Sequence, residues 1–438
     1  MRRPRVLLTT TNRWPLPARL AIRLAKLGCD VFGLCPLPGH PLLKTRSVMR
    51  VFSYNGLHPL PSLLKAINEA APEFIIPCDD RAVAHLHGLY RRLPFSREHS
   101  EEKLAALIEH SLGAHENYHS IVSCRHELIK AAAQQGVRAP ATRQVDSVDD
   151  LRAWRAEQPL PWVLKADGTW GGGGVRFVYS MEEAEQSLRE LMRPPSSASV
   201  VSAMVLNRDR SWRLGTLRDR ERKISVQEFV RGRPANCAVV CYRGQVLAGI
   251  GVEVISSQDE KGPATVVRVL DSSEMKFAAE RIAARLRWSG FFGLDFMIEE
   301  GTRDYYLIEM NPRCTPLCQL ELGDGRDMVQ ALCEKILCLP CAPTASVTSK
   351  DVLAYFPQAV KCRSEFLGLS FLDVPYEEPE LVDALLHPSS QRTLLGKLVD
   401  LTRGWRDTED CAKEYVFEDA AALLRSTSPN ELGVPIIG

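Results

Sequence analysis

The sequence has almost no net charge and no long hydrophobic run. Its 438 residues include 55 Lys and Arg against 54 Asp and Glu, a formal net charge of +1. Without a basic excess there is little to displace counterions from a polyanion, so a small molecule is a more natural partner than nucleic acid. No stretch approaches the roughly 20 apolar residues that span a bilayer, and the apolar run Val6–Leu8 is too short for an export signal. We therefore expect no nucleic-acid partner and no membrane association.

The 13 cysteines do not form a framework of closely spaced pairs. Their number is odd and they are scattered through a long chain, which favours free thiols in a reducing compartment and a cytoplasmic protein. Cys338 and Cys341 form a Cys-x-x-Cys pair, but Cys314 and Cys318 make a poor second pair for zinc. Zinc binding and a redox pair remain alternatives, and buried thiols are the favoured interpretation.

Two common nucleotide-binding motifs are also missing. The turn after the first expected strand reads Thr-Thr-Thr-Asn-Arg-Trp-Pro, without the Gly-x-Gly-x-x-Gly of dinucleotide-binding folds. No Gly-Lys-Ser/Thr is present at the chain's one glycine-rich loop, which excludes a P-loop there. Any nucleotide site must be built differently.

What the sequence does contain is an α/β pattern, and its length suggests about three structural units. Residues 1–115 alternate short apolar strands with amphipathic helices, which is typical of an open parallel α/β sheet. Asp79 and Asp80 follow the expected strand Glu73–Pro77, at an edge where such sheets bind ligands. The favoured alternative is a helix N-cap. Long alternating strands occupy residues 224–310, and the last ~100 residues mix strand and helix signals.

A glycine-rich segment joins two expected strands in the middle of the chain. Gly171, Gly172, Gly173 and Gly174 allow the backbone to approach a ligand, and their N–H groups can surround an anion. Lys165 lies near the end of the incoming strand and adds a positive charge. This combination suits a triphosphate. The alternative is a flexible hairpin with an exposed lysine.

Oxygen ligands follow on two later strands. Asp295 interrupts the apolar run Phe291–Ile298, and Glu309, Asn311 and Arg313 fall on one face of the next strand because side chains alternate. If the two strands pair, Asp295, Glu309 and Asn311 form a patch of hard ligands suited to Mg²⁺. Arg313 adds a planar donor for phosphate or carboxylate. The alternative is a structural salt bridge between Glu309 and Arg313.

Together these segments resemble the ATP-grasp superfamily, with carboxylate–amine ligases and biotin carboxylase among the similar proteins. The resemblance covers residues 116–340 and depends on the order of five pieces. They are Arg125 opening a helix that ends in Gly136-Val137, Val163–Lys165 with its glycine loop, Ser225–Gly232, Gly293–Phe296 and Glu309–Arg313. It implies an α/β chain with a pre-ATP-grasp domain over 1–115, a two-part ATP-grasp domain over 116–340 (116–200 and 201–340), and a C-terminal α+β extension over 341–438.

The resemblance also implies roles for individual residues. Arg125 and Lys165 would contact the ATP phosphates beneath the glycine loop. Gln227, Glu228, Phe229 and Val230 would surround the adenine, although Phe229 could simply pack in the core. Asp295, Glu309 and Asn311 would hold Mg²⁺, or Mn²⁺ in its place, and Arg313 would steady the transferred phosphate. Beside what the resemblance implies, Arg268 and Lys261 could supply a further cation near the γ-phosphate, with solvation at the surface as the favoured alternative for Lys261. Pro234 stands where related proteins carry an acid for the ribose.

The function implied is an ATP-dependent ligase. It would activate a small carboxylate as an acyl phosphate and join it to an amine, by default an amino-acid-like one, or to a thiol, with release of ADP and phosphate. The N-terminal domain and the extension would shape the acceptor site, and the protein could assemble as a homodimer. Two alternatives stay open: a carboxylase or phosphotransferase on the same scaffold, and a nucleotide-binding regulator without turnover.

Overall fold

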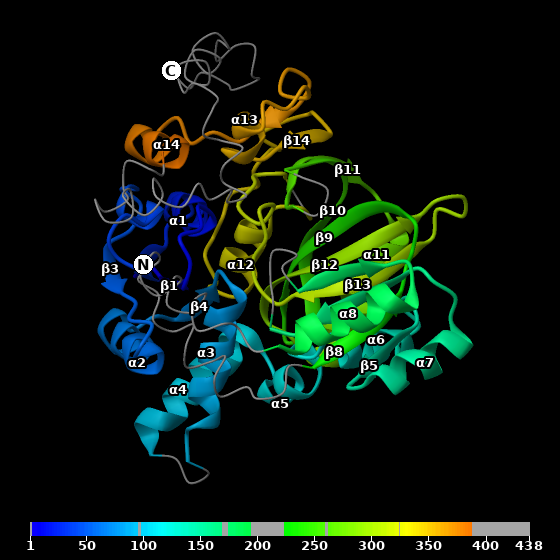
Figure 1. Ribbon diagram of the computed structural model, residues 1–438. Helices are drawn as coiled ribbons and strands as arrows, with labels where there is room; N and C mark the ends of the chain where they lie inside the picture. The colour runs from blue at the N-terminus through cyan, green and yellow to red at the C-terminus, as the bar shows by residue number, and fades with distance from the viewer. Residues whose placement is uncertain are drawn as a thin grey trace, which may run out of the picture.

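The computed structural model describes residues 2–94, 98–168, 174–193, 223–258, 262–323 and 325–387. Within these ranges the chain forms three sheets with helices packed against them. Figure 1 shows the N-terminal sheet, in blue, on one side of the molecule and the two green-to-yellow sheets on the other. Helix α12 (Met328–Lys335) contacts both α1 and the large sheet, so it joins the two halves.

The N-terminal sheet is parallel, as its alternating pattern predicted. Its strand order is β3-β2-β1-β4, and each strand is followed by helical or turn structure that covers a face of the sheet. The strands are β1 (Arg5–Thr9), β2 (Asp30–Cys35), β3 (Arg50–Ser53) and β4 (Phe74–Pro77). The helices are α1 (Leu16–Lys26), the 3₁₀ turn η1 (Pro41–Leu43), α2 (Pro59–Ala70), α3 (Asp80–Arg91) and α4 (His99–Leu112).

A small four-stranded sheet follows, in the order β5-β8-β6-β7. One face packs against α7 and α8 through an apolar cluster that includes Trp162, Leu164 and Val226. The opposite face carries the polar side chains described below. The elements are α5 (His115–Asn117), the π-helical turn η2 (Tyr118–Val122), α6 (Arg125–Gln134), β5 (Thr142–Val145), α7 (Val148–Glu157), β6 (Trp162–Ala166), β7 (Val175–Val178), α8 (Met181–Met192) and β8 (Ile224–Glu228).

The large sheet has seven strands in the order β13-β12-β9-β10-β11-β14-β15. Apolar side chains on its two faces belong to two separate core clusters, one shared with α11 and the other with α12. The elements are β9 (Gly232–Tyr242), β10 (Gln245–Ser257), β11 (Ala264–Leu270), α11 (Ser273–Leu286), β12 (Gly290–Glu299), β13 (Tyr305–Asn311), β14 (Val352–Ala354), α13 (Gln358–Lys361), β15 (Phe371–Leu372) and α14 (Pro379–Leu386).

The sheets do not follow the expected domain divisions at 200/201 and 340/341. Strand β8 pairs with β5 and β6 and so joins the small sheet, although it lies beyond residue 200. Strand β14 pairs with β11 and extends the large sheet, although it belongs to the expected C-terminal extension. Strand β8 lies between β5 and β6, and β14 lies between β11 and β15, pairings that the pattern along the chain does not reveal.

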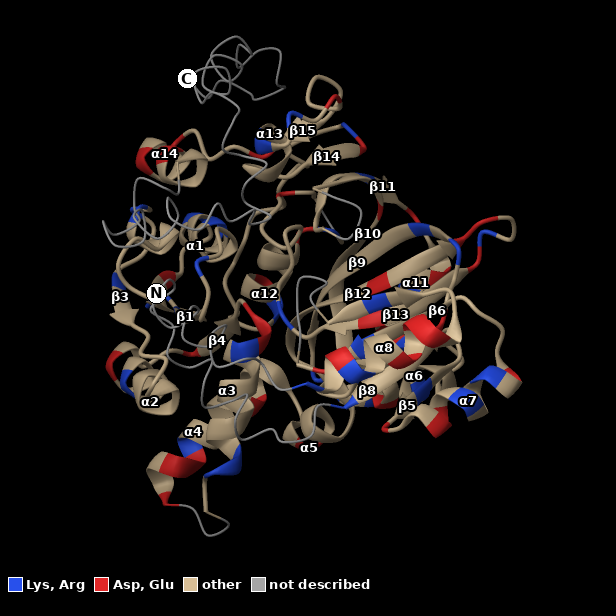
Figure 2. Cartoon of the chain, in the orientation of Figure 1, with Lys and Arg blue, Asp and Glu red and all other residues tan. Residues whose placement is uncertain are grey.

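The distribution of charged residues, the apolarity of the helices and the state of the cysteines agree with what the composition indicated. Figure 2 shows Lys and Arg interspersed with Asp and Glu on α4, α7 and α8, as expected for a chain with a net charge of +1. No helix in the described ranges combines the length and apolarity that crossing a membrane requires. The twelve described cysteines are thiols, and nine of them are buried, in line with the thiol interpretation.

Candidate active site

Lys165 is buried where the small sheet meets β13. Its neighbours Leu164 and Ala166 point into the core beneath α8, so alternation turns Lys165 to the opposite face. Only 5% of the residue is exposed, and its Nζ donates to the Ile308 carbonyl oxygen at 3.1 Å. Burial lowers the pKa of Lys165 to about 8, with Arg125 acting in the same direction and Glu309 opposing it. The alternative interpretation, in which Lys165 is an exposed lysine beside a flexible hairpin, is therefore wrong for this side chain.

The predicted carboxylate patch forms across β12 and β13. Asp295 lies directly opposite Glu309 in the antiparallel register, which puts both side chains on one face. The amide of Asn311 donates to Asp295 Oδ2 at 2.8 Å, and Asn236 on β9 donates to the other carboxylate oxygen. Burial, followed by the charge of Glu309, raises the pKa of Asp295 to about 6, against the two amide hydrogen bonds.

Arg125 connects α6 to this patch. Its Nη2 donates to Glu309 Oε1 at 2.8 Å and its Nε to the same oxygen at 3.2 Å. Its Nη1 also donates to the carbonyl oxygen of Ala166, at the end of the strand that carries Lys165. Burial acts to raise the pKa of Glu309, but the positive charges of Arg125 and Lys165 outweigh it and lower that pKa. Glu309 is therefore an ionised carboxylate between two cations.

Arg313 reaches the N-terminal domain. Its Nε donates to Asp80 Oδ2 at 2.9 Å and its Nη2 to Asn311 Oδ1 at 3.1 Å, while the guanidinium lies 5.1 Å from the centre of the Trp14 ring. The alternative of a salt bridge to Glu309 is wrong, because Asp80 is the carboxylate beside Arg313 and Arg125 pairs with Glu309.

Of the two acids after β4, one is a helix N-cap and the other lies at the candidate site, so each of the two interpretations applies to one of them. Asp79 is the N-cap of α3, accepting from Ala82 N at 2.9 Å, and it also binds Thr10 and Thr11. Asp80 points instead to Arg313, so the site includes one acid from the N-terminal domain. Sequence analysis located Asp80 at a ligand-binding edge but could not identify its partner.

The residues expected to surround the adenine are the last two residues of β8 and the two that follow them. Gln227 lies opposite Val163, two residues before Lys165, so both polar side chains share a face. Gln227 is buried and its Nε2 donates to Thr142 Oγ1 at 3.0 Å. Glu228 is exposed and accepts from the Ala141 N–H at 3.2 Å.

Phe229 and Val230 continue this end of the site. The Phe229 ring meets Phe177 of β7 edge to face, with 5.8 Å between ring centres, and Val230 is buried. Residues Gly171–Gly173 lie outside the described residues. Gly174 is described, and its carbonyl oxygen accepts from Ala166 N at 3.0 Å, at the base of the loop.

Arg268 is not brought to this site. On the large sheet Arg268 of β11 lies opposite Glu253 of β10, and Glu253 in turn lies opposite Ala235 of β9. Asp295 lies opposite Asn236, the next residue along β9, so Arg268 and Asp295 point to opposite faces. Arg268 donates to Glu253 at 2.9 Å instead, which corrects the expectation of a cation near the transferred phosphate. Lys261 lies outside the described residues.

The donor set fits a divalent cation through its electrostatics. The described residues hold no group of three or more His, Cys, Asp and Glu side chains arranged for a metal ion, so Asp295 and Glu309 would need Asn311 and outside ligands. The repulsion that helps to raise the pKa of Asp295 is what a hard cation between the two carboxylates would relieve. Nucleotide-bound Mg²⁺ needs only one or two protein carboxylates, because phosphate and water complete its shell.

Comparison with known proteins identifies the fold around these residues. Residues 124–319 match the family model described as the ATP-binding domain of the carbamoyl-phosphate synthase L chain. Acetyl-CoA carboxylase from Dictyostelium discoideum is 24% identical over 169 residues, which are 39% of this chain and 7% of that protein. The chain thus spans a small fraction of this relative.

Solved structures extend the similarity to most of the chain. Biotin carboxylase from Campylobacter jejuni, in complex with an ATP analogue, is 14% identical with a TM-score of 0.56 over 78% of this chain and 72% of its own. L-amino acid ligase from Bacillus licheniformis is also 14% identical, with a TM-score of 0.50 over 79% and 76% of the two chains. The prediction made from five short motifs is confirmed: this chain has the ATP-grasp fold.

Proposed function

We propose that this protein is an ATP-dependent carboxylate–amine ligase. The observation that carries the proposal is the convergence of Lys165 from the small sheet and Arg125 from α6 with the carboxylates of Asp295 and Glu309 from the large sheet. Cations and hard oxygen ligands together suit a nucleoside triphosphate with its divalent ion. The matches to ATP-grasp carboxylases and ligases support the same conclusion.

The chain's own residues would divide the work. Lys165 and Arg125 would bind and orient phosphate oxygens, and their burial strengthens these charge–charge interactions because little water screens them. Gln227 and the backbone near Val230 would position the purine beside Phe229. Asp295, Glu309 and Asn311 would hold Mg²⁺, which when bound neutralises charge on the phosphates.

The proposed chemistry needs no nucleophile from the protein. A carboxylate oxygen of the acid attacks the γ-phosphorus, and the bond from phosphorus to the ADP oxygen breaks. The amine then attacks the acyl carbon, the carbon–oxygen bond breaks with phosphate as the leaving group, and the amine loses a proton to solvent. Arg313 would steady the acyl phosphate, since Asp80 and Asn311 fix its guanidinium in place.

The test is ADP and phosphate release over a matrix of small carboxylates and amines. We expect release only when both substrate types are present, and a loss of ~100-fold or more in Lys165→Ala and in Glu309→Ala. Lys350→Ala is a matched control, because Lys350 donates to the Ser370 carbonyl oxygen away from the carboxylates. Full ADP formation in both site variants, with their folds intact, would remove the assignment.

Carboxylation is the second candidate, because the acetyl-CoA carboxylase and biotin carboxylase matches favour it. In that reaction bicarbonate is the carboxylate that receives the phosphoryl group. Bicarbonate-dependent ADP release, with no stimulation by any other acid, would support carboxylation and exclude the ligase.

A further inference from the structure

The N-terminal sheet reverses its strand order next to the candidate active site. In the order β3-β2-β1-β4 the chain runs outward from β1 to β3 and then returns to the other side of β1 with β4. Open parallel α/β sheets bind ligands at the carboxyl ends of their strands, at such a switch point. Here that edge consists of the loop after β1, residues 10–15, and of Asp80 after β4, and Arg313 reaches it from the segment after β13.

The two acids at this edge differ in how many partners they have. The carboxylate of Asp79 is buried and accepts hydrogen bonds from Thr10, from Thr11 and from the backbone at the start of α3. These bonds fix the loop after β1 to the end of β4. Asp79 is therefore a structural group, and Asp80 is the acid available to a ligand.

Asp80 keeps one carboxylate oxygen for an outside partner. Its Oδ2 accepts from Arg313 Nε at 2.9 Å, and no other hydrogen bond to this carboxylate is found among the described residues. The Asp80 side chain is 36% exposed, against 11% for that of Arg313. Because a carboxylate oxygen only accepts hydrogen bonds and carries negative charge, the group that suits Oδ1 is a cationic N–H donor.

Asp80 also lies close to both arginines of the proposed reaction centre. Burial lowers the pKa of Arg125, but the carboxylates around it, Asp80 among them, raise it on balance. Burial lowers the pKa of Arg313 as well, and the charge and hydrogen bond of Asp80 outweigh it. An ammonium group on Asp80 Oδ1 would therefore lie next to the acyl phosphate that Arg313 would steady, at the distance an attack requires.

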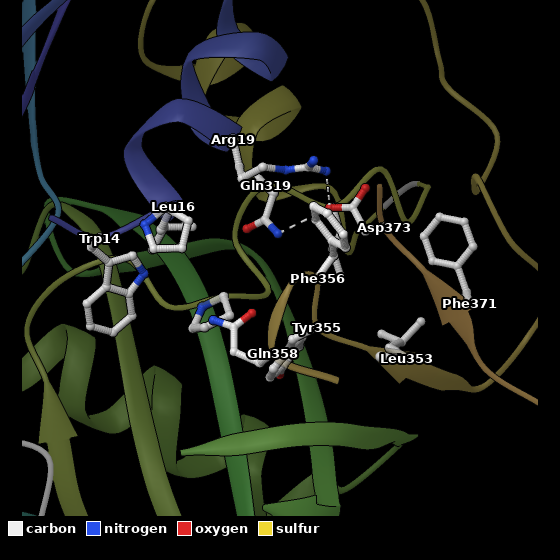
Figure 3. Close-up of a pocket in the computed structure, with 14 residues that line it drawn as sticks. Trp14, Leu16, Arg19, Gln319, Leu353, Tyr355, Phe356, Gln358, Phe371 and Asp373 are labelled. Carbon is white, nitrogen blue, oxygen red and sulfur yellow. Dashed lines mark hydrogen bonds and ion pairs between the residues drawn. The ribbon is translucent and has the colours of Figure 1, made fainter. Parts of the chain in front are cut away.

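The neighbouring pocket offers no other place for such a group. Figure 3 shows Trp14 and Leu16 on one side of this pocket and Phe371 on the other. Its free space accommodates about one or two water molecules, which is too little for a substrate. Trp14 packs there against the apolar core, and its ring lies 5.1 Å from the Arg313 guanidinium, which helps to hold that group beside Asp80.

We propose that Asp80 selects the nucleophile of the ligation, and that this nucleophile is a primary amine that enters as an ammonium ion. The proposal rests on the proposed function and concerns the choice between an amine and a thiol. Asp80 Oδ1 would accept an N–H of the amine. A thiol reacts as its thiolate, which the negative charge of Asp80 would repel.

Asp80 stays ionised throughout the proposed step. The ammonium ion releases one proton to solvent and becomes a neutral amine, while a remaining N–H still donates to Asp80. The amine nitrogen attacks the acyl carbon, the bond from that carbon to the phosphate oxygen breaks, and phosphate leaves. A second proton passes from the nitrogen to solvent as the amide forms. Asp80 thus binds and orients the amine.

The test uses hydroxylamine, an uncharged nucleophile that traps acyl phosphates as hydroxamates. Full-length wild type and Asp80→Asn are assayed with ATP, Mg²⁺, the carboxylates of the matrix and excess hydroxylamine, and then with the matrix amines in its place. We expect equal hydroxamate formation but a loss of about tenfold or more in kcat/KM for the amine in Asp80→Asn. The asparagine carbonyl oxygen can still accept from Arg313, but its N–H₂ group would face the amine.

Asp149→Asn is the matched control, because Asp149 pairs with an arginine on the exposed surface of α7 and should change neither rate. Equal loss of hydroxamate and amide in Asp80→Asn would show that Asp80 acts only by holding Arg313, and would overturn the proposal. Unchanged amide formation would overturn it too, as would a wild type that passes the acyl group to N-acetylcysteamine or to no amine. No hydroxamate from any acid in wild type would instead overturn the ligase itself, and the role of Asp80 with it.

Discussion

Two buried ionisable groups with opposite requirements define the site at the scale of single residues. Lys165 must be protonated to bind phosphate, and burial lowers its pKa to about 8. Asp295 must be ionised to hold a cation, and burial with the charge of Glu309 raises its pKa to about 6. Both groups are in their required state only between these two values.

We therefore predict a bell-shaped dependence of kcat/KM for ATP on pH. Activity should fall below about pH 6, where Asp295 takes up a proton, and above about pH 8, where Lys165 loses one. The measurement is initial ADP release from about pH 5 to about pH 9.5 at a fixed Mg²⁺ concentration below saturation, because saturating metal would displace the proton from Asp295 and shift the acid limb downward. A Lys165→Arg variant with residual activity should lose the alkaline limb, because arginine stays charged. An alkaline limb unchanged in that variant would contradict the assignment to Lys165.

Asp295 should also limit stability. Its pKa in the folded protein, about 6, lies above the ordinary value of 3.8, so the ionised form is disfavoured by folding. The cost is absent below pH 3.8 and fully developed above about pH 6. We predict that Asp295→Asn raises the free energy of unfolding at about pH 8 by up to about 3 kcal/mol in metal-free buffer, while ADP release is lost.

Chemical unfolding at about pH 8 and at about pH 4.5 measures this effect, which should shrink at the lower pH. Asp351→Asn, at an exposed loop position, is the matched control and should change little. A destabilised Asp295→Asn protein at the higher pH would show that the carboxylate supports the fold.

At the scale of elements, the helix starts were predictable and the strand contacts were not. Ser147, Ser180 and Ser272 each precede an amphipathic stretch, and each accepts a hydrogen bond as the N-cap of its helix. These signals are local, so sequence alone reveals them. Gly232 begins β9 for a reason that depends on a distant strand: a Cβ there would lie 1.9 Å from the Ile298 carbonyl oxygen of β12.

We predict that Gly232→Ala destabilises the protein by about 1–3 kcal/mol, because the methyl group forces β9 and β12 apart at the end of their ladder. Gly88→Ala is the control. Gly88 lies inside α3, and apart from its chain neighbours and the backbone of its own helix no atom lies within 4 Å of the position that an alanine methyl group would take. Alanine should therefore stabilise the helix by about 0.5–1 kcal/mol. Urea unfolding of both variants checks the two signs, and equal shifts would contradict the close approach.

At the scale of the whole molecule, buried charge pairs dock the N-terminal domain onto the rest. Arg23 of α1 lies 2.6 Å from Asp327, and both side chains are at most 5% exposed. Glu321 lies 3.2 Å from the same guanidinium. Arg19 and Asp373 make the second pair. Docking of this kind places Asp80 against Arg313 and so completes the site.

We predict that Asp327→Asn destabilises the protein by about 3 kcal/mol, because it leaves the buried Arg23 with Glu321 alone. Asp327 is also the N-cap of α12, accepting from Gln330 N at 2.9 Å, a bond that asparagine can still accept. Asp327→Ala should therefore cost about 1 kcal/mol more. Urea unfolding midpoints compare the variants. No difference from wild type in Asp327→Asn would show that the pair contributes nothing to docking.

The sequence alone determined the fold class and the residue types of the candidate site. Alternation along β12 and β13 placed Asp295, Glu309 and Asn311 on one face, because side-chain direction in a strand follows from position. Only the tertiary structure decided which charges meet. Arg125 forms an ion pair with Glu309, Arg313 forms one with Asp80, and Arg268 points to the opposite face of the sheet, where it binds Glu253. Partner choice depends on strand register and domain docking between segments far apart in the chain, and these are set by packing that no local pattern encodes.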